Sequence, residues 1–175
     1  MTYDYDVIVI GGGGAGMAAA ITACDSGARV ALLEAANQLG GSTALSGGVV
    51  YGAPTSIQRA AGIDSDTVDA MFEYYMTLNQ HKVEPSIVRR LCELSGPAIE
   101  WLISMGVEFD PAELYASGVE SVPRGHKTTG NGAALSEVLD REVNRRNIDV
   151  SRGCRVTALH TDEHGCVRGV VLDGE

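Results

Sequence analysis

The 175-residue sequence lacks any apolar run near the roughly 20 residues that a membrane-spanning helix needs. No signal peptide is expected, because the first apolar stretch is short, has no basic flank and ends in glycines. Basic residues are scarce: 13 Lys and Arg against 23 Asp and Glu give a formal net charge of −10. Such a charge repels a phosphate backbone. We therefore expect neither a membrane span nor a nucleic-acid partner.

Cysteine and metal-binding patterns are also sparse. The cysteines are scattered with no C-x-x-C pair, which predicts reduced thiols and a cytoplasmic location. His160 and His164 flank a predicted turn and lack a third ligand, so we expect no metal site. The four cysteines are Cys24, Cys92, Cys154 and Cys166.

What the sequence does contain is a dinucleotide-binding pattern near its start. Residues 3–10 (YDYDVIVI) predict a buried strand, and GGGGAG follows with G-x-G-x-x-G spacing. An Ala-rich segment predicts a helix over 14–26, and a second strand over 29–33 is followed by Glu34. Together these segments form a complete βαβ fingerprint.

Each glycine of the fingerprint has a predicted role. Gly11 permits the tight turn, Gly13 lets phosphates approach the backbone, and Gly16 lets the helix pack on the sheet. The amides near Gly14 and Ala15 are expected to face the phosphates with help from the helix dipole. No basic side chain is needed there, and none is present.

Glu34 and a second glycine cluster narrow the choice of dinucleotide. A carboxylate at this distance accepts hydrogen bonds from ribose hydroxyls and would repel the 2′-phosphate of NADP. The cluster GGSTALSGG at residues 40–48 offers small residues and backbone donors, which a loop packed on a planar flavin needs. FAD is therefore predicted, and an NAD-dependent dehydrogenase domain is disfavoured.

Further helices and strands are predicted from hydrophobic periodicity. Residues 36–62 are expected to be loop-rich, residues 110–130 irregular, and the Glu142–Arg146 pair solvated on the helix after Gly132. A strand is expected at 148–150 and a hairpin from 156–161 and 166–172. The three helices expected between these regions are 66–78, one from Pro85 that buries Val88, Leu91 and Cys92, and one capped by Ser95 with Ala98, Trp101, Leu102 and Met105 inward.

The predicted fold class is α/β, a Rossmann-like FAD-binding domain with a glutathione-reductase-like βαβ unit, an inserted helical segment and a β-hairpin. The expected segments are residues 1–52 for the fingerprint and flavin loop, 53–130 for the insert, and 131–175 for the helix, strand and hairpin. The aromatic and methionine stripe with the single tryptophan is interpreted as core packing rather than flavin stacking.

Three motifs carry a family resemblance. VIVIGGGGAG, LLEAANQLGGSTALSGG and RGHKTTGNGAALSEVL resemble, in order and spacing, the flavoproteins grouped with fumarate reductases and 3-ketosteroid dehydrogenases. The resemblance implies a loop over the isoalloxazine and pyrophosphate, Glu34 on the ribose and the Val156 backbone on the adenine; Ala35 departs from the lysine common there. The implied FAD contacts are Gly11, Gly13, Gly14, Ala15, Gly16, Glu34, Gly41, Ser42, Thr43, Gly47, Gly48 and Val156.

The resemblance also implies a reaction, which is hydride transfer between a carbonyl-activated C–C bond and flavin N5. The segment SGGVVYGAPTSIQRAAGIDSD and the paired tyrosines favour a ketosteroid-like enone substrate, with a fumarate or acrylate reductase as the alternative. Tyr115, Tyr51 and His126 are candidates for moving the proton; for Tyr115, a packing role is the simpler interpretation.

In relatives the substrate domain and the main catalytic residues lie beyond the last position of this sequence. We therefore expect an N-terminal portion of a longer flavoenzyme that acts on a small molecule. A stand-alone FAD-binding module served by another chain is a second hypothesis. The electron donor or acceptor is not assigned.

Overall fold

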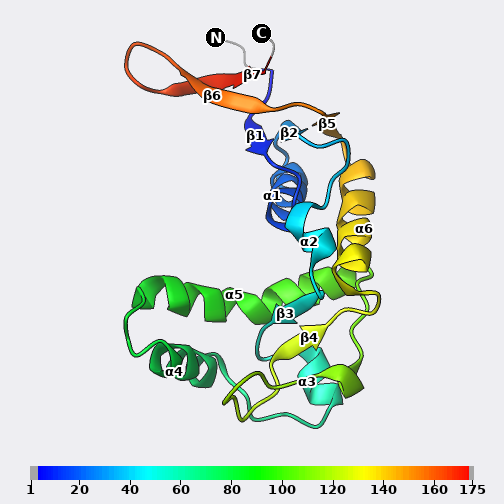
Figure 1. The fold of residues 1–175 in the computed structure, drawn as a ribbon, viewed down its shortest axis with the longest axis vertical. Helices are drawn as coiled ribbons and strands as arrows, with labels where there is room; N and C mark the ends of the chain where they lie inside the picture. Colours follow the sequence, from blue (N-terminus) through cyan, green and yellow to red (C-terminus); the bar gives the residue numbers. More distant parts are fainter. Residues whose placement is uncertain (1–3, 174–175) are drawn as a thin grey trace. The chain divides into compact units, whose positions relative to one another are not determined.

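A computed structural model describes residues 4–173 and shows a mixed α/β chain whose element order is traced in Figure 1. The chain divides into two compact units. The first unit consists of residues 1–46 and 135–175, and the second of residues 47–134. Each unit is described separately below.

The first unit is built on a three-stranded parallel sheet in the order β1-β2-β5. The strands are β1 (Val7–Ile10), β2 (Val30–Glu34) and β5 (Ile148–Arg152). β2 is central, and its first four residues are buried, as expected for the middle of a parallel sheet. The observed strand β1 starts at Val7, four residues after the predicted start at Tyr3. Tyr3 lies outside the described residues. Glu34 is the last residue of β2 rather than the residue after it.

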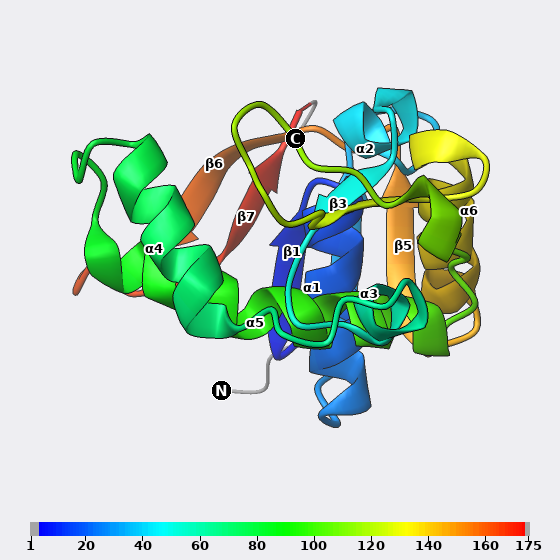
Figure 2. The same cartoon turned by 90° about the horizontal axis from the view of Figure 1, so that it is seen from below.

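Helix α1 (Gly14–Asp25) packs against all three strands (Figure 2). Met17, Ala20 and Ile21 are fully buried and form the face of the helix that lies on the sheet. The small residues of this face let the helix lie close to the sheet. The helix begins directly after the glycine loop, so its N-terminus lies near the carboxyl end of β1.

The predicted helix after Gly132 is present as α6 (Asn131–Asn144), whose apolar face includes the buried Leu139 and Val143. The prediction that Glu142 is solvated was wrong, because its side chain is only 3% exposed. Arg145 and Arg146 both contact its carboxylate at 2.8 Å and cover it. Arg146 also contacts Asp25 at 2.7 Å, which links α6 to the end of α1.

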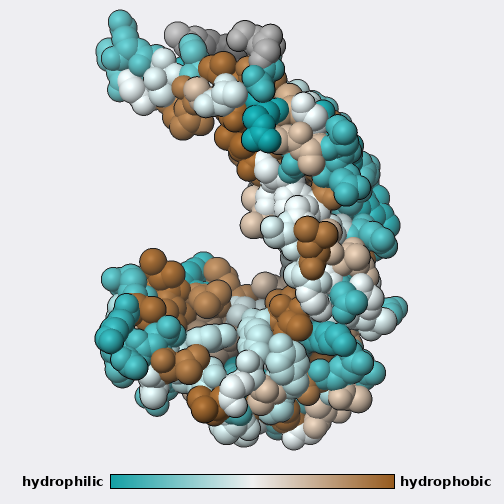
Figure 3. Space-filling model, in the orientation of Figure 1, coloured by the Kyte–Doolittle hydropathy of each residue, from teal (hydrophilic) through white to brown (hydrophobic). Residues whose placement is uncertain are grey.

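The predicted hairpin is present as β6 (Val156–Thr161) and β7 (Val167–Leu172), paired antiparallel. Asp162 closes its turn by accepting the amides of His164 and Cys166. Beside β1 the hairpin borders a groove of about 480 Å³, and Figure 3 shows apolar surface there. Its apolar lining includes Ile8, Ile10, Leu159, Val167 and Val170.

The second unit contains a two-stranded antiparallel sheet that was not predicted. β3 (Val49–Tyr51) and β4 (Gly125–Lys127) lie in the segments expected to be loop-rich and irregular. Strands of three residues are too short to show alternation, which explains the error. The same segments also contain three short helical elements, which are α2 (Gly41–Leu45, in the first unit), α3 (Ser56–Ala60) and η1 (Pro111–Glu113).

Helices α4 (Val68–Leu78) and α5 (Pro85–Ser104) pack side by side in the second unit (Figures 1 and 2). The prediction of two helices over 85–105 was wrong, because α5 runs through Pro97 without interruption. Ser95 is not an N-cap but a buried hydroxyl that donates to the Cys92 carbonyl at 2.9 Å.

The continuous helix changes which of its side chains are buried. Leu91 is 55% exposed and Ala98 is exposed, although both were expected to face inward. The predicted burial of Cys92 and Leu102 is confirmed, and a single helical period through Pro97 adds other residues to the buried face. The buried residues of α5 are Cys92, Ser95, Gly96, Ile99 and Leu102.

A buried charge cluster joins the loops of the second unit. Arg124 contacts Asp66 at 2.7 Å and Glu120 at 3.0 Å, and all three side chains are at most 4% exposed. Burial acts to raise the pKa of Asp66, but hydrogen bonds from Arg124 and Gln58 hold it below its ordinary value. The carboxylate therefore stays ionised and paired.

Replacing Arg124 should destabilise the second unit strongly. Arg124→Leu leaves two buried carboxylates without their cation, which we expect to lower the free energy of unfolding by about 3–5 kcal/mol. Urea denaturation followed by circular dichroism measures the loss. Arg59→Leu, at an exposed position of α3, serves as the control and should change little. Equal midpoints for the two variants would contradict the structural role of the cluster.

Candidate functional site

The loop between β1 and α1 contains two glycines that the protein itself requires. Gly11 has φ +98°, a backbone conformation that side chains disfavour, and its amide donates to the Leu33 carbonyl at 2.7 Å. A Cβ on Gly16 would overlap the Gly11 carbonyl oxygen. These positions therefore need glycine for the turn and for the approach of helix to strand, whatever the loop binds.

Gly13 is different, because nothing in the protein requires a glycine there. Its φ of −73° suits any residue, and the nearest atom to a Cβ would be the Gly40 carbonyl oxygen at 3.9 Å. Immediately after it, Ala15 and Gly16 lie in the first turn of α1, where amides lack intrahelical acceptors. The loop thus leaves room beside Gly13 and directs amides and the positive end of a helix dipole toward that room.

The second glycine cluster meets the first within the same unit. Gly13 and Gly40 form a parallel bridge, and the Gly40 amide donates to the Gly12 carbonyl at 2.8 Å. The Gly14 amide donates to Thr43 Oγ1 at 3.1 Å. The predicted contact residues Gly14 and Thr43 therefore lie together. The Gly14 amide, which was expected to face the phosphates, is hydrogen-bonded to the threonine hydroxyl in this structure.

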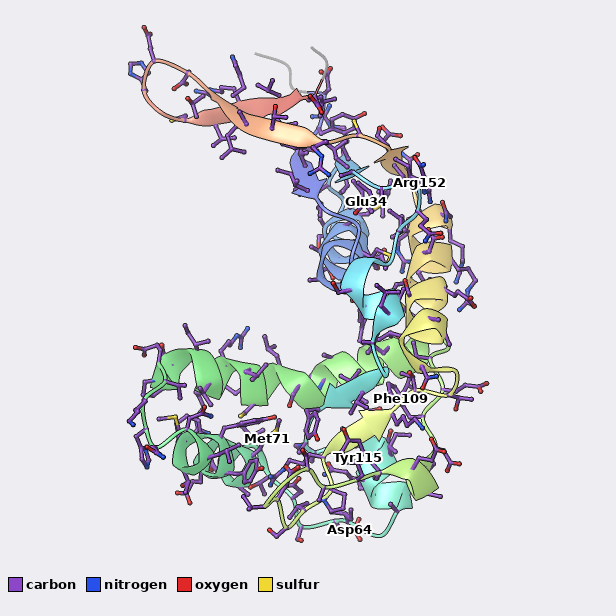
Figure 4. The ribbon with its side chains drawn as sticks, viewed as in Figure 1. Glu34, Asp64, Met71, Phe109, Tyr115 and Arg152 are labelled. Atoms are coloured by element: carbon purple, nitrogen blue, oxygen red, sulfur yellow. The ribbon has the colours of Figure 1, made fainter. Side chains whose placement is uncertain are left out.

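Glu34 lies at the carboxyl end of β2, beside Arg152 of β5 in the strand register (Figure 4). Its Oε1 accepts the Ala36 amide at 2.7 Å and its Oε2 accepts the Gly12 amide at 2.6 Å. The hydrogen bonds from Ala36 and Gly12 hold the pKa of Glu34 below its ordinary value. The carboxylate is therefore ionised next to the glycine loop, and lone pairs remain for ribose hydroxyls.

The later part of the second cluster packs on the turn before α6, in the second unit. The Gly48 carbonyl accepts the amide of Thr128 at 2.9 Å and its hydroxyl at 3.0 Å. A Cβ on Gly48, which has φ +71°, would overlap Thr128 Oγ1. The remaining predicted contacts lie at the surface: Gly41, Ser42 and Gly47 are exposed, and Val156, the first residue of β6, is half-buried.

His126 falls in the segment 110–130 that was expected to be irregular, but it is a buried residue of strand β4. Its Nδ1 lies 2.8 Å from the Arg124 carbonyl and therefore carries the proton, and its Nε2 accepts from Thr55 Oγ1 at 2.7 Å. Burial lowers the pKa of His126 below its ordinary value. With both ring nitrogens engaged, this side chain is a structural neutral histidine rather than a proton-transfer group.

Tyr51 and Tyr115, the other two candidates, lie together in the second unit. Their rings meet edge to face with centroids 6.0 Å apart, and the backbone of Tyr115 pairs with Gly125 of β4. Tyr115, which is labelled in Figure 4, lies between η1 and β4. It is 40% exposed. The Tyr51 hydroxyl raises the pKa of Tyr115 above its ordinary value, so the phenol stays protonated at neutral pH.

Sequence reasoning missed two residues that shape the loop, Gly12 and Leu39. A Cβ on Gly12 would overlap Leu39 Cδ2 and approach Glu34 Oε2 at 3.3 Å. The run of four consecutive glycines was the available signal, since the fingerprint itself leaves position 12 free. Among residues 4–173, no group of three His, Cys, Asp or Glu side chains is arranged to hold a metal ion.

The strand–glycine loop–helix unit with an acid at the end of β2 defines a dinucleotide-binding protein. More narrowly, the chain belongs to the FAD binding domain family, whose sequence profile matches residues 6–175. The features described above fit this cofactor, because the space beside Gly13 would be filled by a Cβ and small residues line the second cluster. The predictions of the fold class and of FAD are confirmed.

Known relatives agree with this assignment. The chain is 37% identical over 172 residues to the fumarate reductase (cytochrome) of Shewanella frigidimarina and 38% identical over 173 residues to the urocanate reductase of Eggerthella lenta. It covers 97% of itself in each match but only 30% and 28% of those proteins.

A solved structure agrees as well. A 3-ketosteroid-delta4-(5alpha)-dehydrogenase from Rhodococcus jostii RHA1 matches with a TM-score of 0.86 and 28% identity, over 99% of this chain and 43% of that one. In the part of the chain that the structure describes, no helix has the length and apolarity to cross a membrane.

The buried state of His126 predicts a pH dependence of stability. Its folded-state pKa is lowered from the ordinary 6.5, so the unfolded chain binds the proton first and the free energy of unfolding should fall as pH drops below about 6.5. Urea titrations between about pH 5 and pH 7 measure the slope. His126→Gln should flatten it, whereas His164→Gln, at an exposed position, should leave it unchanged. An unchanged slope in His126→Gln would show that the ring titrates alike in both states.

Proposed function

We propose that this chain holds FAD for an oxidoreductase that transfers hydride between flavin N5 and a C–C bond activated by a neighbouring carbonyl or carboxylate. The observation that carries the cofactor site is Gly13, a glycine that the backbone conformation and the packing do not require. A phosphate at that point would use the room beside it and the first-turn amides of α1.

The proposed FAD contacts combine the geometry of the glycine loop with the positions that the family resemblance implies. The pyrophosphate lies against the loop at Gly13 and the amides of Ala15 and Gly16, and Glu34 accepts the ribose hydroxyls. The adenine lies at the backbone of Val156. The remaining glycine-rich contacts toward the phosphates and the flavin ring are Gly11, Gly14, Gly41, Ser42, Thr43, Gly47 and Gly48.

When bound, FAD supplies the two-electron chemistry. The residues of this chain bind and orient the cofactor, and the small side chains at the second cluster allow close approach to its ring. Tyr115 is the candidate that keeps an exposed position and a protonated phenol, so we propose it as the first residue to test as a proton donor.

The substrate is proposed to be a small molecule with an activated double bond. The segment after the second cluster favours a ketosteroid-like enone. The alternative is an unsaturated acid. It is supported by the identity to a fumarate reductase, 37%, which is higher than the 28% identity to the ketosteroid dehydrogenase. The scattered free cysteines support a cytoplasmic location. A stand-alone FAD-binding module, served by a catalytic domain on another chain, is the alternative organisation.

Two glycine variants separate cofactor contact from folding. Gly13→Ala should leave the urea midpoint unchanged, because its Cβ meets no protein atom closer than 3.9 Å, yet weaken FAD binding at least about tenfold. Gly16→Ala should instead lower the free energy of unfolding by about 1–3 kcal/mol, because its Cβ overlaps a carbonyl oxygen. Quenching of FAD fluorescence measures the affinity. Wild-type affinity in a folded Gly13→Ala variant would refute the phosphate position.

Turnover distinguishes the substrate classes. With the enzyme that carries this chain, we expect a 3-ketosteroid to reduce an artificial electron-accepting dye, or fumarate to oxidise a reduced dye. Tyr115→Phe should lower kcat without weakening FAD binding if the phenol moves the proton, and Tyr5→Phe, in the first unit, serves as the matched control. If the enzyme turned over neither substrate, both candidate substrate classes would be rejected, whereas the proposed FAD site would be unaffected.

A further inference from the structure

Glu34 makes two hydrogen bonds that a ribose acceptor does not require. Its Oε2 accepts the Gly12 amide of the glycine loop at 2.6 Å, and its Oε1 accepts the Ala36 amide at 2.7 Å. The side chain therefore reaches from the end of β2 across to the loop that follows β1. Both oxygens are engaged by backbone before any ligand is considered.

The Gly12 peptide is held on both sides by these contacts. Its amide donates to Glu34, and its carbonyl accepts the Gly40 amide at 2.8 Å. Leu39 and Glu34 lie so close to its Cα that a side chain has no room. Gly12 directly precedes Gly13, the position proposed for phosphate contact, so the Glu34 carboxylate sets the orientation of the peptide that leads into it.

We propose that Glu34 is a positioning residue for the phosphate loop as well as the acceptor for the ribose. It orients the loop so that the amides following Gly13 are arranged before the dinucleotide arrives. The two roles are compatible, because a carboxylate has about four acceptor sites and two are used by backbone amides. The ribose role rests on the proposed function; the loop role stands on the hydrogen bonds of the protein alone.

Glu34→Gln tests the loop role with little change of shape. One carboxylate oxygen becomes an NH2 group, which cannot accept from an amide, so the variant loses either the Gly12 or the Ala36 bond. The surviving bond also loses its charge, and charged hydrogen bonds are the stronger ones. Glu163→Gln, on the hairpin turn with a side chain 87% exposed, removes the same charge without touching the loop and is the matched control.

The first measurement is amide NMR and hydrogen exchange on the 175-residue chain without cofactor. In Glu34→Gln the Gly12 and Ala36 amide resonances should both move upfield, because one bond is lost and the other loses its charge, and the amide whose bond is lost should exchange about tenfold faster or more. Glu163→Gln should leave both unchanged. Unaltered Gly12 shift and exchange in Glu34→Gln would overturn the loop role.

If Glu34→Gln does not fold, a pH titration of the wild-type chain answers the same question. The Gly12 amide shift should move as Glu34 is protonated, with a midpoint below the ordinary carboxyl value, because this hydrogen bond favours the charged form. A Gly12 resonance that does not respond to pH through the carboxyl range would equally overturn the proposal.

Inorganic pyrophosphate is the decisive probe, because it has no ribose. Removing a negative charge near the loop should, by electrostatics alone, strengthen anion binding. The positioning role predicts the reverse, which is weaker pyrophosphate binding in Glu34→Gln than in wild type, measured by the shift of the Ala15 amide. Equal or stronger binding would contradict it.

Titration of the wild-type chain with FAD keeps the two proposals distinguishable. Failure to bind FAD, together with a Gly12 amide whose shift and exchange depend on Glu34, would contradict the proposed function and still support the loop role. FAD binding together with a Gly12 amide that does not respond to Glu34 would support the proposed function and contradict the loop role.

Discussion

The cofactor site depends on the contact between two glycine-rich segments that are nearly 30 residues apart in the chain. Gly40 donates to Gly12, Thr43 accepts from Gly14, and Gly13 bridges Gly40, all within one unit. This approach is possible only because the facing positions lack side chains. A Cβ on Gly12 or Gly14 would lie against Leu39 or Thr43. The loop after β1 is therefore not an independent motif, because its conformation is completed by residues that follow β2.

The glycines of this region are present for different physical reasons, which the fingerprint alone does not separate. Gly11 provides a positive φ, and Gly16 lets the helix approach the preceding carbonyl. Gly13 has neither requirement, and its freedom from internal constraint is what indicates a ligand. The turn predicted at Gly11 and the close packing predicted at Gly16 agree with the structure, because the βαβ unit is a local arrangement of strand, turn and helix, whereas the phosphate contact at Gly13 stays a prediction. The backbone geometry was needed to assign a separate cause to each.

Elements with a clear local period were predictable, whereas those fixed by tertiary contacts were not. The strands around the fingerprint, α4 and the hairpin follow from apolar spacing. The three-residue strands β3 and β4 pair residues some 75 positions apart and have no period of their own. α5 continues through Pro97 because its buried face, including Gly96 and Ile99, packs on residues 52–54 within the second unit. Burial of Glu142 and His126 likewise depends on partners distant in sequence or on flanking arginines, so both were misplaced.

Glu34 and a pyrophosphate are both negatively charged, and the loop sequence beside them contains no basic residue to balance the two charges. The hydrogen bonds of Glu34 explain how its charge is stabilised there. Two backbone amides stabilise the carboxylate, and the charge of Arg155 adds a smaller contribution, so the carboxylate is balanced mainly by backbone dipoles. The pyrophosphate can in turn be stabilised by the helix dipole and first-turn amides of α1. In the proposed site, backbone dipoles stabilise both anions, and the carboxylate that we expect to repel a 2′-phosphate also orients the peptide leading to the pyrophosphate. The two proposals thus assign the choice of dinucleotide and the shape of its loop to one side chain.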